Sequence, residues 1–392
     1  MLSFYIIVSL TILLIIYGAI EYQLHQKKLK SIPIRIHING TRGKSSVTRL
    51  IGAGLRAGGL KTITKVTGTF PRIILADGSE AIVHRKEQAN ILEQLDIIKF
   101  CSKQQADVLI IECMALQPIY QKITEHQMIK ADIGVITNIR LDHLDVMGPT
   151  LDDVAKAICS TIPKKSKLFT SEDRYLGFMQ KIAKKRKTKI HNSDPKTITN
   201  NDLKGFSYIE HKDNIALALD ICTELGVDRS VALPEMKRSK PDEGVLRHFT
   251  VKENGKRIHF YNALAANDPE STIMIWDAIR NQSEENEHFM FLLNTRQDRQ
   301  DRAIRLVDMM SQLDYGSIGL VGESLDMVVT MCEKQDIPTT KIHAIGAKTT
   351  LEQYHDLCEA SLSNTTIIAI GNMGAGGAEL SEHFERIHQT SN

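Results

Sequence analysis

The fold is decided by the stretch Ile34-Arg35-Ile36-His37-Ile38-Asn39-Gly40-Thr41-Arg42-Gly43-Lys44-Ser45-Ser46. Its first five residues alternate between apolar and polar like a short strand, and the next five read as a turn. Apolar residues then recur at helical spacing from Lys44 to Ala57. A glycine-containing turn between a strand and a helix is the context in which a loop binds phosphate. The stretch therefore predicts a strand, a phosphate loop and a helix.

Each residue type in this loop suits a nucleotide. Glycines let the backbone curl so that successive N–H groups point at phosphate oxygens, and the following helix presents its positive end. Lys44 is expected to reach the β and γ phosphates of ATP, and Ser45 to offer its hydroxyl to Mg²⁺. The full pattern needs glycine at position 38, so Ile38 makes this loop a shortened variant. The alternative is a plain glycine turn. The predicted contacts of the loop are Gly40, Thr41, Arg42, Gly43, Lys44, Ser45 and Ser46.

Polar side chains follow two further predicted strands. Glu112 comes after the strand 107–111, and His143 lies in the loop after the strand 132–137. Ligands of open parallel sheets bind at the carboxyl ends of the strands, so both side chains are expected beside the phosphate loop. We predict that Ser45, Glu112 and His143 hold Mg²⁺ and that Lys44, Glu112 and His143 are catalytic. The alternatives are a plain strand-end acid and a structural Asp-His loop.

The rest of the chain continues the alternation of strands and helices. Helices are expected over 88–103, 151–160 and 214–225, and the polar stretch 228–244 is the best linker candidate. Strands are expected again near 258–261, 289–293, 318–321 and 366–370. We predict an α/β fold: a central domain with a mostly parallel sheet over 31–232, and a smaller, Rossmann-like domain over 245–392.

The amino terminus predicts a membrane anchor. No side chain from Met1 to Ile20 carries a charge, and the apolar run is long enough to cross a bilayer as one helix. Basic residues follow the run and none precedes it, which places the body in the cytoplasm. We predict a single-pass anchor over 1–24. A cleaved signal peptide is the alternative, but it would need a basic residue before the apolar stretch.

Composition excludes several other classes. The formal net charge of +2 over 392 residues gives no argument for a nucleic-acid partner. The six cysteines form no Cys-x-x-Cys pair, which argues against a disulfide-stapled secreted domain. An ordinary hydrophobic share of 42% predicts a folded body of two or three domains.

Taken together, these motifs resemble the Mur ligase superfamily, which includes folylpolyglutamate synthase. The resemblance rests on the phosphate loop, on Glu112 after a strand, and on Asn138 followed by Asp142-His143-Leu144-Asp145. The amino-terminal anchor, the run 112–115 and the run 142–150 are similar, more narrowly, to the ligase subunits of capsule-type poly-γ-glutamate synthases. This likeness covers nearly the whole chain.

The resemblance implies roles for matching positions. Lys44 would hold the phosphates, and Ser45, Glu112 and His143 would serve two magnesium ions. Asn214 falls where the family places an adenine-contacting asparagine, and Arg247 near a nucleotide-contacting arginine. A helix cap and a surface charge are the respective alternatives for these two residues.

Some positions depart from the family pattern. Many relatives carry a lysine fifteen residues after the metal histidine, where this chain has Ile158, and Lys156 lies on a different helix face. The usual aspartate and lysine motif of the second domain is replaced by the run 262–268, in which Asp268 is the substrate candidate. No space remains for a nucleotide-sugar domain, so a UDP-linked substrate is not expected.

Arg296 is the second substrate candidate, because a guanidinium just after a strand end could grip a carboxylate. Surface ion pairing is its alternative. The implied reaction is ATP-dependent amide ligation: a glutamate γ-carboxylate becomes an acyl phosphate and is joined to an amine. The product would be poly-γ-glutamate, exported by other membrane subunits. A membrane-bound kinase or regulatory NTPase, or a non-catalytic scaffold of an export complex, are the competing hypotheses.

Overall fold

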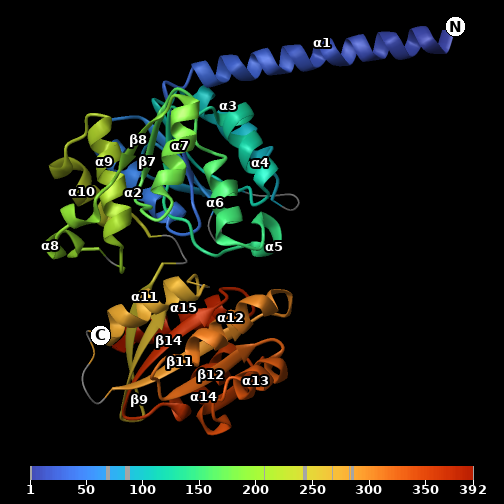
Figure 1. The fold of residues 1–392 in the computed structure, drawn as a ribbon. Coiled ribbons are helices and arrows are strands. Elements are labelled where there is room, and N and C mark those ends of the chain that lie inside the picture. The colour runs from blue at the N-terminus through green and yellow to red at the C-terminus, as the bar shows by residue number, and fades with distance from the viewer. Residues whose placement is uncertain are drawn as a thin grey trace. The chain divides into compact units, whose positions relative to one another are not determined.

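A computed structural model of the chain describes residues 2–67, 71–83, 89–206, 208–241, 245–266, 268–281, 283 and 287–391. The chain divides into two compact units, Met1–Pro241 and Asp242–Asn392, and each is described by itself (Figure 1). Each unit has its own sheet covered by helices, as expected for an α/β fold.

An eight-stranded sheet forms the centre of the first unit, in the order β4-β3-β2-β5-β1-β6-β7-β8. Pairs β2–β3 and β3–β4 are antiparallel and the others are parallel, which confirms the predicted mostly parallel sheet. The strands are β1 (Ile34–Asn39), β2 (Thr62–Val66), β3 (Arg72–Ile74), β4 (Glu80–Ile82), β5 (Val108–Glu112), β6 (Ile133–Ile136), β7 (Lys167–Thr170) and β8 (Lys189–Asn192).

Helices lie on both faces of this sheet (Figure 1). The helices of the first unit are α1 (Leu2–Lys30), α2 (Lys44–Ala57), α3 (Glu93–Gln104), α4 (Pro118–Ile123), the π-helix η1 (Thr124–Ile129), α5 (Leu144–Met147), α6 (Leu151–Cys159), α7 (Leu176–Arg186), the 3₁₀ turn η2 (Pro195–Thr197), α8 (Asn200–Leu203), α9 (Lys212–Glu224) and α10 (Arg229–Arg238). Within the helix expected over 88–103, position 88 lies outside the described residues and the described helix begins at Glu93.

The expected linker over 228–244 was wrong for most of its length. Residues 229–238 form α10, with Pro234 inside the helix, and residues 242–244 lie outside the described part of the chain. Leu233 and Met236 are buried against α2 and α9. Burial of this apolar side favours a helix despite the proline, which removes one backbone hydrogen bond.

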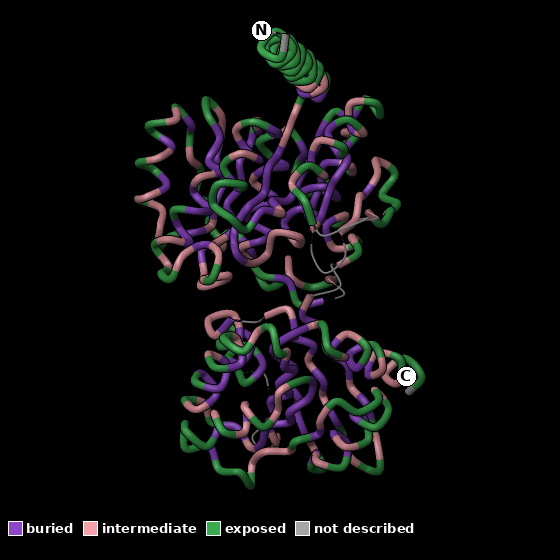
Figure 2. The backbone as a smooth tube through the Cα atoms, turned by 90° about the vertical axis from the view of Figure 1, so that its right-hand side faces the viewer, coloured by how far each residue is buried: buried purple, intermediate pink, exposed green. Residues whose placement is uncertain are grey.

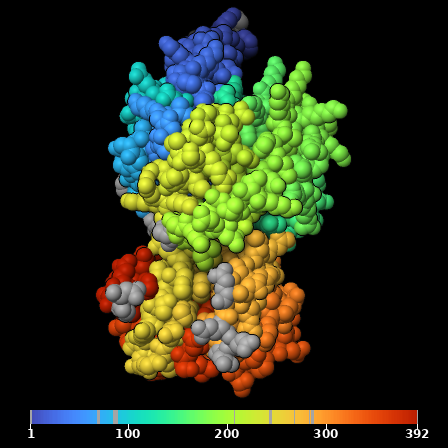
Figure 3. All heavy atoms as spheres, turned by 90° about the vertical axis from the view of Figure 1, so that its left-hand side faces the viewer, coloured from blue at the N-terminus to red at the C-terminus, as the bar shows by residue number. Residues whose placement is uncertain are grey.

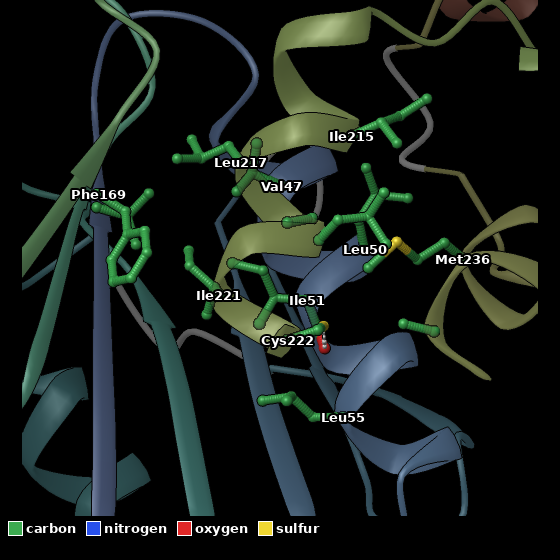
Figure 4. Close-up of a cluster of buried hydrophobic side chains, with 14 of the residues drawn as sticks. Val47, Leu50, Ile51, Leu55, Phe169, Ile215, Leu217, Ile221, Cys222 and Met236 are labelled. Atoms are coloured by element: carbon green, nitrogen blue, oxygen red, sulfur yellow. Dashed lines mark hydrogen bonds between the residues drawn. The ribbon is translucent and has the colours of Figure 1, made fainter. Parts of the chain in front are cut away.

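The main core of the first unit lies between α2, α9 and the sheet. Figure 4 shows Val47, Leu50, Ile51 and Leu55 of α2 meeting side chains of α9 and Met236 of α10. Because α2 begins directly after the phosphate loop, this packing fixes where the loop ends. Figure 3 shows the outer surface of the covering helices, in yellow-green and yellow.

The helix α1 differs from all others in its exposure. Its segment Ser3–Lys30 is long and apolar enough to cross a membrane, and the most apolar part has no buried residue (Figure 2). Its last residues are nevertheless part of the folded body: His25 Nε2 lies 2.8 Å from the carbonyl oxygen of Met128, and Leu29 packs with α3 in a hydrophobic cluster. The helix thus continues without a break from the apolar segment into the body.

A six-stranded sheet forms the second unit, in the order β13-β12-β11-β14-β10-β9, with only β9–β10 antiparallel among its described strands. Apolar clusters cover both faces of this sheet. Its strands are β9 (Arg247–Glu253), β10 (Lys256–Asn262), β11 (His288–Thr295), β12 (Ser317–Gly322), β13 (Ile342–Gly346) and β14 (Asn364–Gly371). Its helices are α11 (Pro269–Arg280), η3 (Gln297–Arg299), α12 (Gln300–Met310), α13 (Leu325–Lys334), η4 (Thr339–Lys341), α14 (Thr350–Ala360) and α15 (Gly377–Ser391).

Candidate functional site

Three neighbouring strands of the first unit deliver the predicted site residues to one edge of the sheet. β1 lies between β5 and β6, and all three run in parallel. Ile38 pairs with Glu112 in β5, and Asn39 pairs with Ile136 in β6. The phosphate loop, Glu112 and the loop after β6 therefore leave the sheet at the same level.

Both loop glycines adopt a backbone that other residues rarely adopt. Gly40 has φ of 136° and Gly43 has φ of 76°. A Cβ at Gly40 would collide with the hydroxyl of Thr137, and a Cβ at Gly43 would lie 2.7 Å from Asn214 Oδ1. Glycine is thus required at both positions by conformation and by space. Asn214, which lies on α9, is a direct neighbour of the loop.

Asn138 holds the loop in shape, a role that the sequence analysis missed. Its side-chain Oδ1 accepts hydrogen bonds from Thr41 Oγ1 at 2.7 Å and from the backbone N–H of Arg42 at 3.0 Å. Its Nδ2 donates to the carbonyl oxygen of Arg42 at 3.1 Å. A bidentate amide of this kind substitutes for hydrogen bonds that an isolated turn lacks. The signal in the sequence was an asparagine directly after a predicted strand.

Lys44 and Ser45 begin α2 on the side of β5. The Lys44 ammonium donates to the carbonyl oxygens of Gly40 at 2.7 Å and Thr41 at 3.1 Å, so it is folded over the loop. The Ser45 hydroxyl donates to Glu112 Oε2 at 3.0 Å. The structure thus brings together the loop lysine, the loop serine and the strand-end glutamate.

Glu112 is buried, with 2% of its surface exposed, and its carboxylate is held by two donors. Besides Ser45, the backbone N–H of Thr67 donates to Glu112 Oε2 at 2.7 Å. Thr67 follows β2, so a fourth strand end contributes to the site. No motif in the sequence indicated this backbone contact.

His143 lies in the same region but on the other side of the loop. It adopts a left-handed backbone conformation, with φ of 45°, at the start of α5. Its Nε2 lies 3.8 Å from Asp142 Oδ1, and the same oxygen lies 3.7 Å from Arg42 Nη2 in the phosphate loop. Within the part of the chain that the structure describes, no three His, Cys, Asp or Glu side chains are grouped to hold a metal ion.

The hydroxyl of Ser45 and the carboxylate of Glu112 are hard oxygen donors, which is the donor chemistry that Mg²⁺ prefers. Mg²⁺ usually keeps several waters and takes only one or two protein ligands beside nucleotide phosphates. The donor set therefore fits magnesium without a three-residue cluster.

Asn214 is positioned by a buried acid. Its Nδ2 donates to Glu210 Oε1 at 2.7 Å, and Glu210 Oε2 accepts from the Tyr208 hydroxyl at 3.0 Å. Burial, followed by the charge and hydrogen bond of Glu210, raises the pKa of Tyr208. Asn214 lies inside α9, which begins at Lys212, so it is not the residue that caps this helix.

The candidates in the second unit have partners within that unit. Arg247 on β9 makes two hydrogen bonds to the Glu385 carboxylate, at 3.0 and 3.1 Å. Asp268 caps α11 by accepting from the backbone N–H of Ser271 at 2.9 Å. In the run 262–268, position 267 lies outside the described residues.

Arg296 follows β11 and pairs with Asp298 through two hydrogen bonds, at 2.9 and 2.8 Å. Both residues line an open hollow of about 620 Å³, together with Gln297, Glu323 and Ala375. In this pair, the Asp298 carboxylate neutralises much of the positive charge that Arg296 would otherwise present to a substrate carboxylate.

Ile158, which stands where many relatives have a lysine, differs from that lysine in its surroundings as well as in its chemistry. Ile158 is buried in the apolar cluster behind α6, whereas the Lys156 side chain is 65% exposed and pairs with Asp153. Lys156 thus lies on a different side of α6 and cannot replace the missing lysine by a simple change of rotamer.

Beneath the loop, β1 carries a buried ion pair. His37 Nδ1 lies 2.8 Å from Glu125 Oε2, and both side chains are 1% exposed. Burial alone would lower the pKa of His37, but the neighbouring Cys113 and Glu125 side chains outweigh it and raise the pKa to about 9. Charge on His37 therefore stabilises the strand that leads into the loop.

Two family models match the chain, one for each unit. The Mur ligase middle domain matches residues 38–226, and the poly-gamma-glutamate synthase CapB C-terminal domain matches residues 248–387. The first match includes the phosphate loop, Glu112, His143 and Asn214.

Solved structures share the fold at low sequence identity. The Escherichia coli FolC in complex with DHPP and ADP has a TM-score of 0.67 and 13% identity, over 93% of this chain and 92% of that chain. A Yersinia pestis folylpolyglutamate synthase/dihydrofolate synthase complexed with AMPPNP and Mn ion has a TM-score of 0.66 and 12% identity, over 93% and 92% of the two chains.

Curated relatives are much more similar in sequence. The capsule biosynthesis protein CapB of Bacillus anthracis is 39% identical over 96% of this chain and 81% of its own length. The PGA synthase CapB of Bacillus subtilis (strain 168) is 35% identical over 98% of this chain and 97% of its own length. With these identities over nearly its whole length, the chain belongs to the CapB family of poly-γ-glutamate synthases, which are ATP-dependent ligases with a Mur ligase middle domain.

Proposed function

We propose that this chain joins glutamate into poly-γ-glutamate by activating a γ-carboxylate with ATP. The observation that carries the proposal is the contact between Ser45, at the start of α2 beside the glycine loop, and Glu112, at the end of β5. Relatives named for capsule biosynthesis and for PGA synthesis support the polymer as the product. Residues 31–232 would be the ATP-binding domain, and residues 245–392 a second domain that carries the substrate candidates Asp268 and Arg296.

The chemistry begins with a poor acyl donor. A carboxylate oxygen of glutamate attacks the γ phosphorus of ATP, ADP leaves, and an acyl phosphate forms. The amine of a second glutamate then attacks the carbonyl carbon and loses a proton, and inorganic phosphate leaves with the original carboxylate oxygen. Each amide bond thus costs one ATP, and water must be kept from the acyl phosphate.

The residues of the chain have distinct parts in this reaction. Backbone N–H groups of the run 40–46 would bind the phosphates, and Lys44 would move from the loop carbonyl oxygens to the β and γ phosphates. Ser45 and Glu112 would hold one Mg²⁺, and His143 would hold a second ion. Bound magnesium offsets negative charge on the phosphates.

Asn214 and Arg247 would contact the nucleotide, and Asp268 and Arg296 the amino-acid substrate. Arg296 would have to exchange Asp298 for the substrate carboxylate, which has the same chemistry. Charge-assisted pairs exchange readily where both groups reach solvent, and the two side chains are 40% and 58% exposed.

The helix α1 supports a proposal for the location of the enzyme. We propose that this helix crosses the cell membrane once and that the body lies in the cytoplasm, where ATP is available. Lys27, Lys28 and Lys30 at its carboxyl end support this orientation. Other membrane subunits would export the polymer.

Oxygen tracing tests the reaction. Membranes that contain the full chain are incubated with ATP, Mg²⁺ and glutamate labelled with ¹⁸O in the γ-carboxylate, and ADP and phosphate are analysed. We expect ADP release that depends on glutamate but not on glutamine, and one ¹⁸O atom in each phosphate. A kinase or regulatory NTPase would release ADP without moving ¹⁸O, and that result would exclude the ligase mechanism.

A further inference from the structure

Two histidines and a threonine gather on one face of the sheet in the second unit. His248 and Thr250 are two residues apart on β9, so their side chains lie on the same face of the sheet. On the antiparallel neighbour β10, His259 is the register partner of Thr250. The pairing of a hairpin thus sets the spacing of all three side chains.

The three side-chain atoms that could bind a metal ion, one ring nitrogen from each histidine and the threonine hydroxyl oxygen, form a nearly regular triangle. His248 Nε2 lies 3.1 Å from His259 Nδ1, and Thr250 Oγ1 lies 3.1 Å from the same His259 nitrogen. The third side, from Thr250 Oγ1 to His248 Nε2, measures 3.4 Å. Two ring nitrogens and one hydroxyl oxygen therefore converge without any change of the backbone.

This triangle has the size of one face of a metal coordination sphere. A zinc ion binds imidazole nitrogens at about 2.0–2.1 Å, so two ligands of a tetrahedral site lie roughly 3.3 Å apart. We propose that His248, His259 and Thr250 form a binding site for a divalent transition-metal ion of the zinc class, with solvent completing the coordination.

The surroundings favour this class of ion over magnesium. Imidazole suits zinc, copper and nickel, whereas magnesium takes oxygen ligands. Imidazole binds such an ion in its neutral form, through a ring nitrogen of the kind that His248 and His259 turn toward each other.

Packing also holds the first ligand in place. The His248 ring stacks on Tyr261 with centroids 4.3 Å apart and an interplanar angle of 15°. Tyr261 is the register partner of His248, so the stack is built into the hairpin. Ligand rings that are fixed before binding lose less conformational freedom when the ion binds.

Zinc titration of the full chain tests the site, with excess Mg²⁺ and ADP present to occupy the nucleotide site. The variants are His248→Gln and His259→Gln, and His191→Gln is the matched control, because His191 is also a solvent-exposed histidine on a strand. We expect each of the first two variants to bind one zinc ion at least tenfold more weakly than the wild type, and the control to bind as the wild type does.

Fluorescence of Trp276, which is the only tryptophan and lies in the same unit, verifies that each variant is folded. For any variant that does not fold, Co²⁺ absorption of the wild-type chain gives a second measurement, since nitrogen ligands shift and strengthen the visible bands relative to those of the hydrated ion. Equal zinc affinity in all three variants, or a Co²⁺ spectrum of oxygen ligands only, would overturn the proposal. Ligase activity plays no part in either readout.

Discussion

Substitution of Gly43 by alanine tests whether the phosphate loop is held by its contact with α9. Gly43 has φ of 76°, and a Cβ there would lie 2.7 Å from Asn214 Oδ1. Gly59 is the matched control: it has φ of 83°, and a Cβ there would meet nothing within 4 Å. Both substitutions impose the same backbone strain, but only the first also creates a steric conflict.

The expected losses of stability follow from the backbone strain and the steric conflict. A left-handed alanine costs about 1–2 kcal/mol, which applies to both variants. Overpacking a buried contact costs a further 1–3 kcal/mol, roughly, which applies to Gly43→Ala alone. Adding Asn214→Ala removes the conflict, so the double variant should recover the second term, with a coupling of about 1–3 kcal/mol.

Native-state hydrogen exchange of a peptide that covers α2 measures the opening free energy of this region. Trp276 fluorescence in denaturant is the internal control, because it reports on the second unit, which contains neither glycine. The proposed packing of the loop against α9 is refuted if Gly43→Ala and Gly59→Ala lower the opening free energy of α2 equally. It is also refuted if adding Asn214→Ala to Gly43→Ala does not restore any of the lost opening free energy.

Three further predictions concern the site. Lys44→Ala should reduce glutamate-dependent ADP release by about a hundredfold or more, since the lysine would face the transferred phosphoryl group. Substitution of the exposed Lys61 by alanine should leave this rate unchanged. Full turnover by Lys44→Ala would remove the loop from the mechanism. Glu112→Gln should raise the Mg²⁺ concentration needed for half-maximal activity at least tenfold. Asp107→Asn, at the other end of β5, should leave this concentration unchanged. An unchanged Mg²⁺ requirement in Glu112→Gln would contradict the proposal that Glu112 binds Mg²⁺. Because the pKa of His37 is raised to about 9, its contribution to stability is complete below pH 6.5 and is lost as pH rises toward 9. Unfolding midpoints should therefore fall over that range, and His37→Gln should flatten the profile; an equal fall in the variant would show that another group titrates.

The sequence predicted the elements that have strong local patterns. The strand before the phosphate loop, the helix after it and the strands that lead to Glu112 and to the loop of His143 were found within three residues of their ends. These are buried apolar runs with turns beside them, and their pattern does not depend on distant residues. The strands β2, β3, β4, β7, β8, β9 and β13 were not predicted. In β8, for example, Lys189, His191 and Asn192 are exposed and carry no apolar period.

Contacts between distant parts of the chain could not be read in this way. The helix α10 was taken for a linker because its buried apolar residues pack mainly against α2, which is far away in the sequence. In the site, Thr67 N–H reaches Glu112 from another strand, and a backbone donor has no signature in the sequence. Tertiary burial and hydrogen bonding decide such features, and local propensity is then a weak guide.

The shortened phosphate loop illustrates how distant residues compensate for a local departure. Where the full pattern has a glycine, Ile38 is still part of β1: it is buried and pairs with Glu112 on one side and with Val135 on the other. The strand therefore runs on to Asn39 and leaves only a short turn. Fewer loop residues can form fewer hydrogen bonds among themselves, and Asn138 supplies the missing bonds from the next strand end. Because the same segment continues to Asp142, which lies near Arg42, the loop that carries His143 and the loop that would hold the phosphates form one hydrogen-bonded body. A displacement of one loop must then displace the other. The position of the proposed second metal ligand, His143, therefore depends on how the phosphate loop holds the nucleotide.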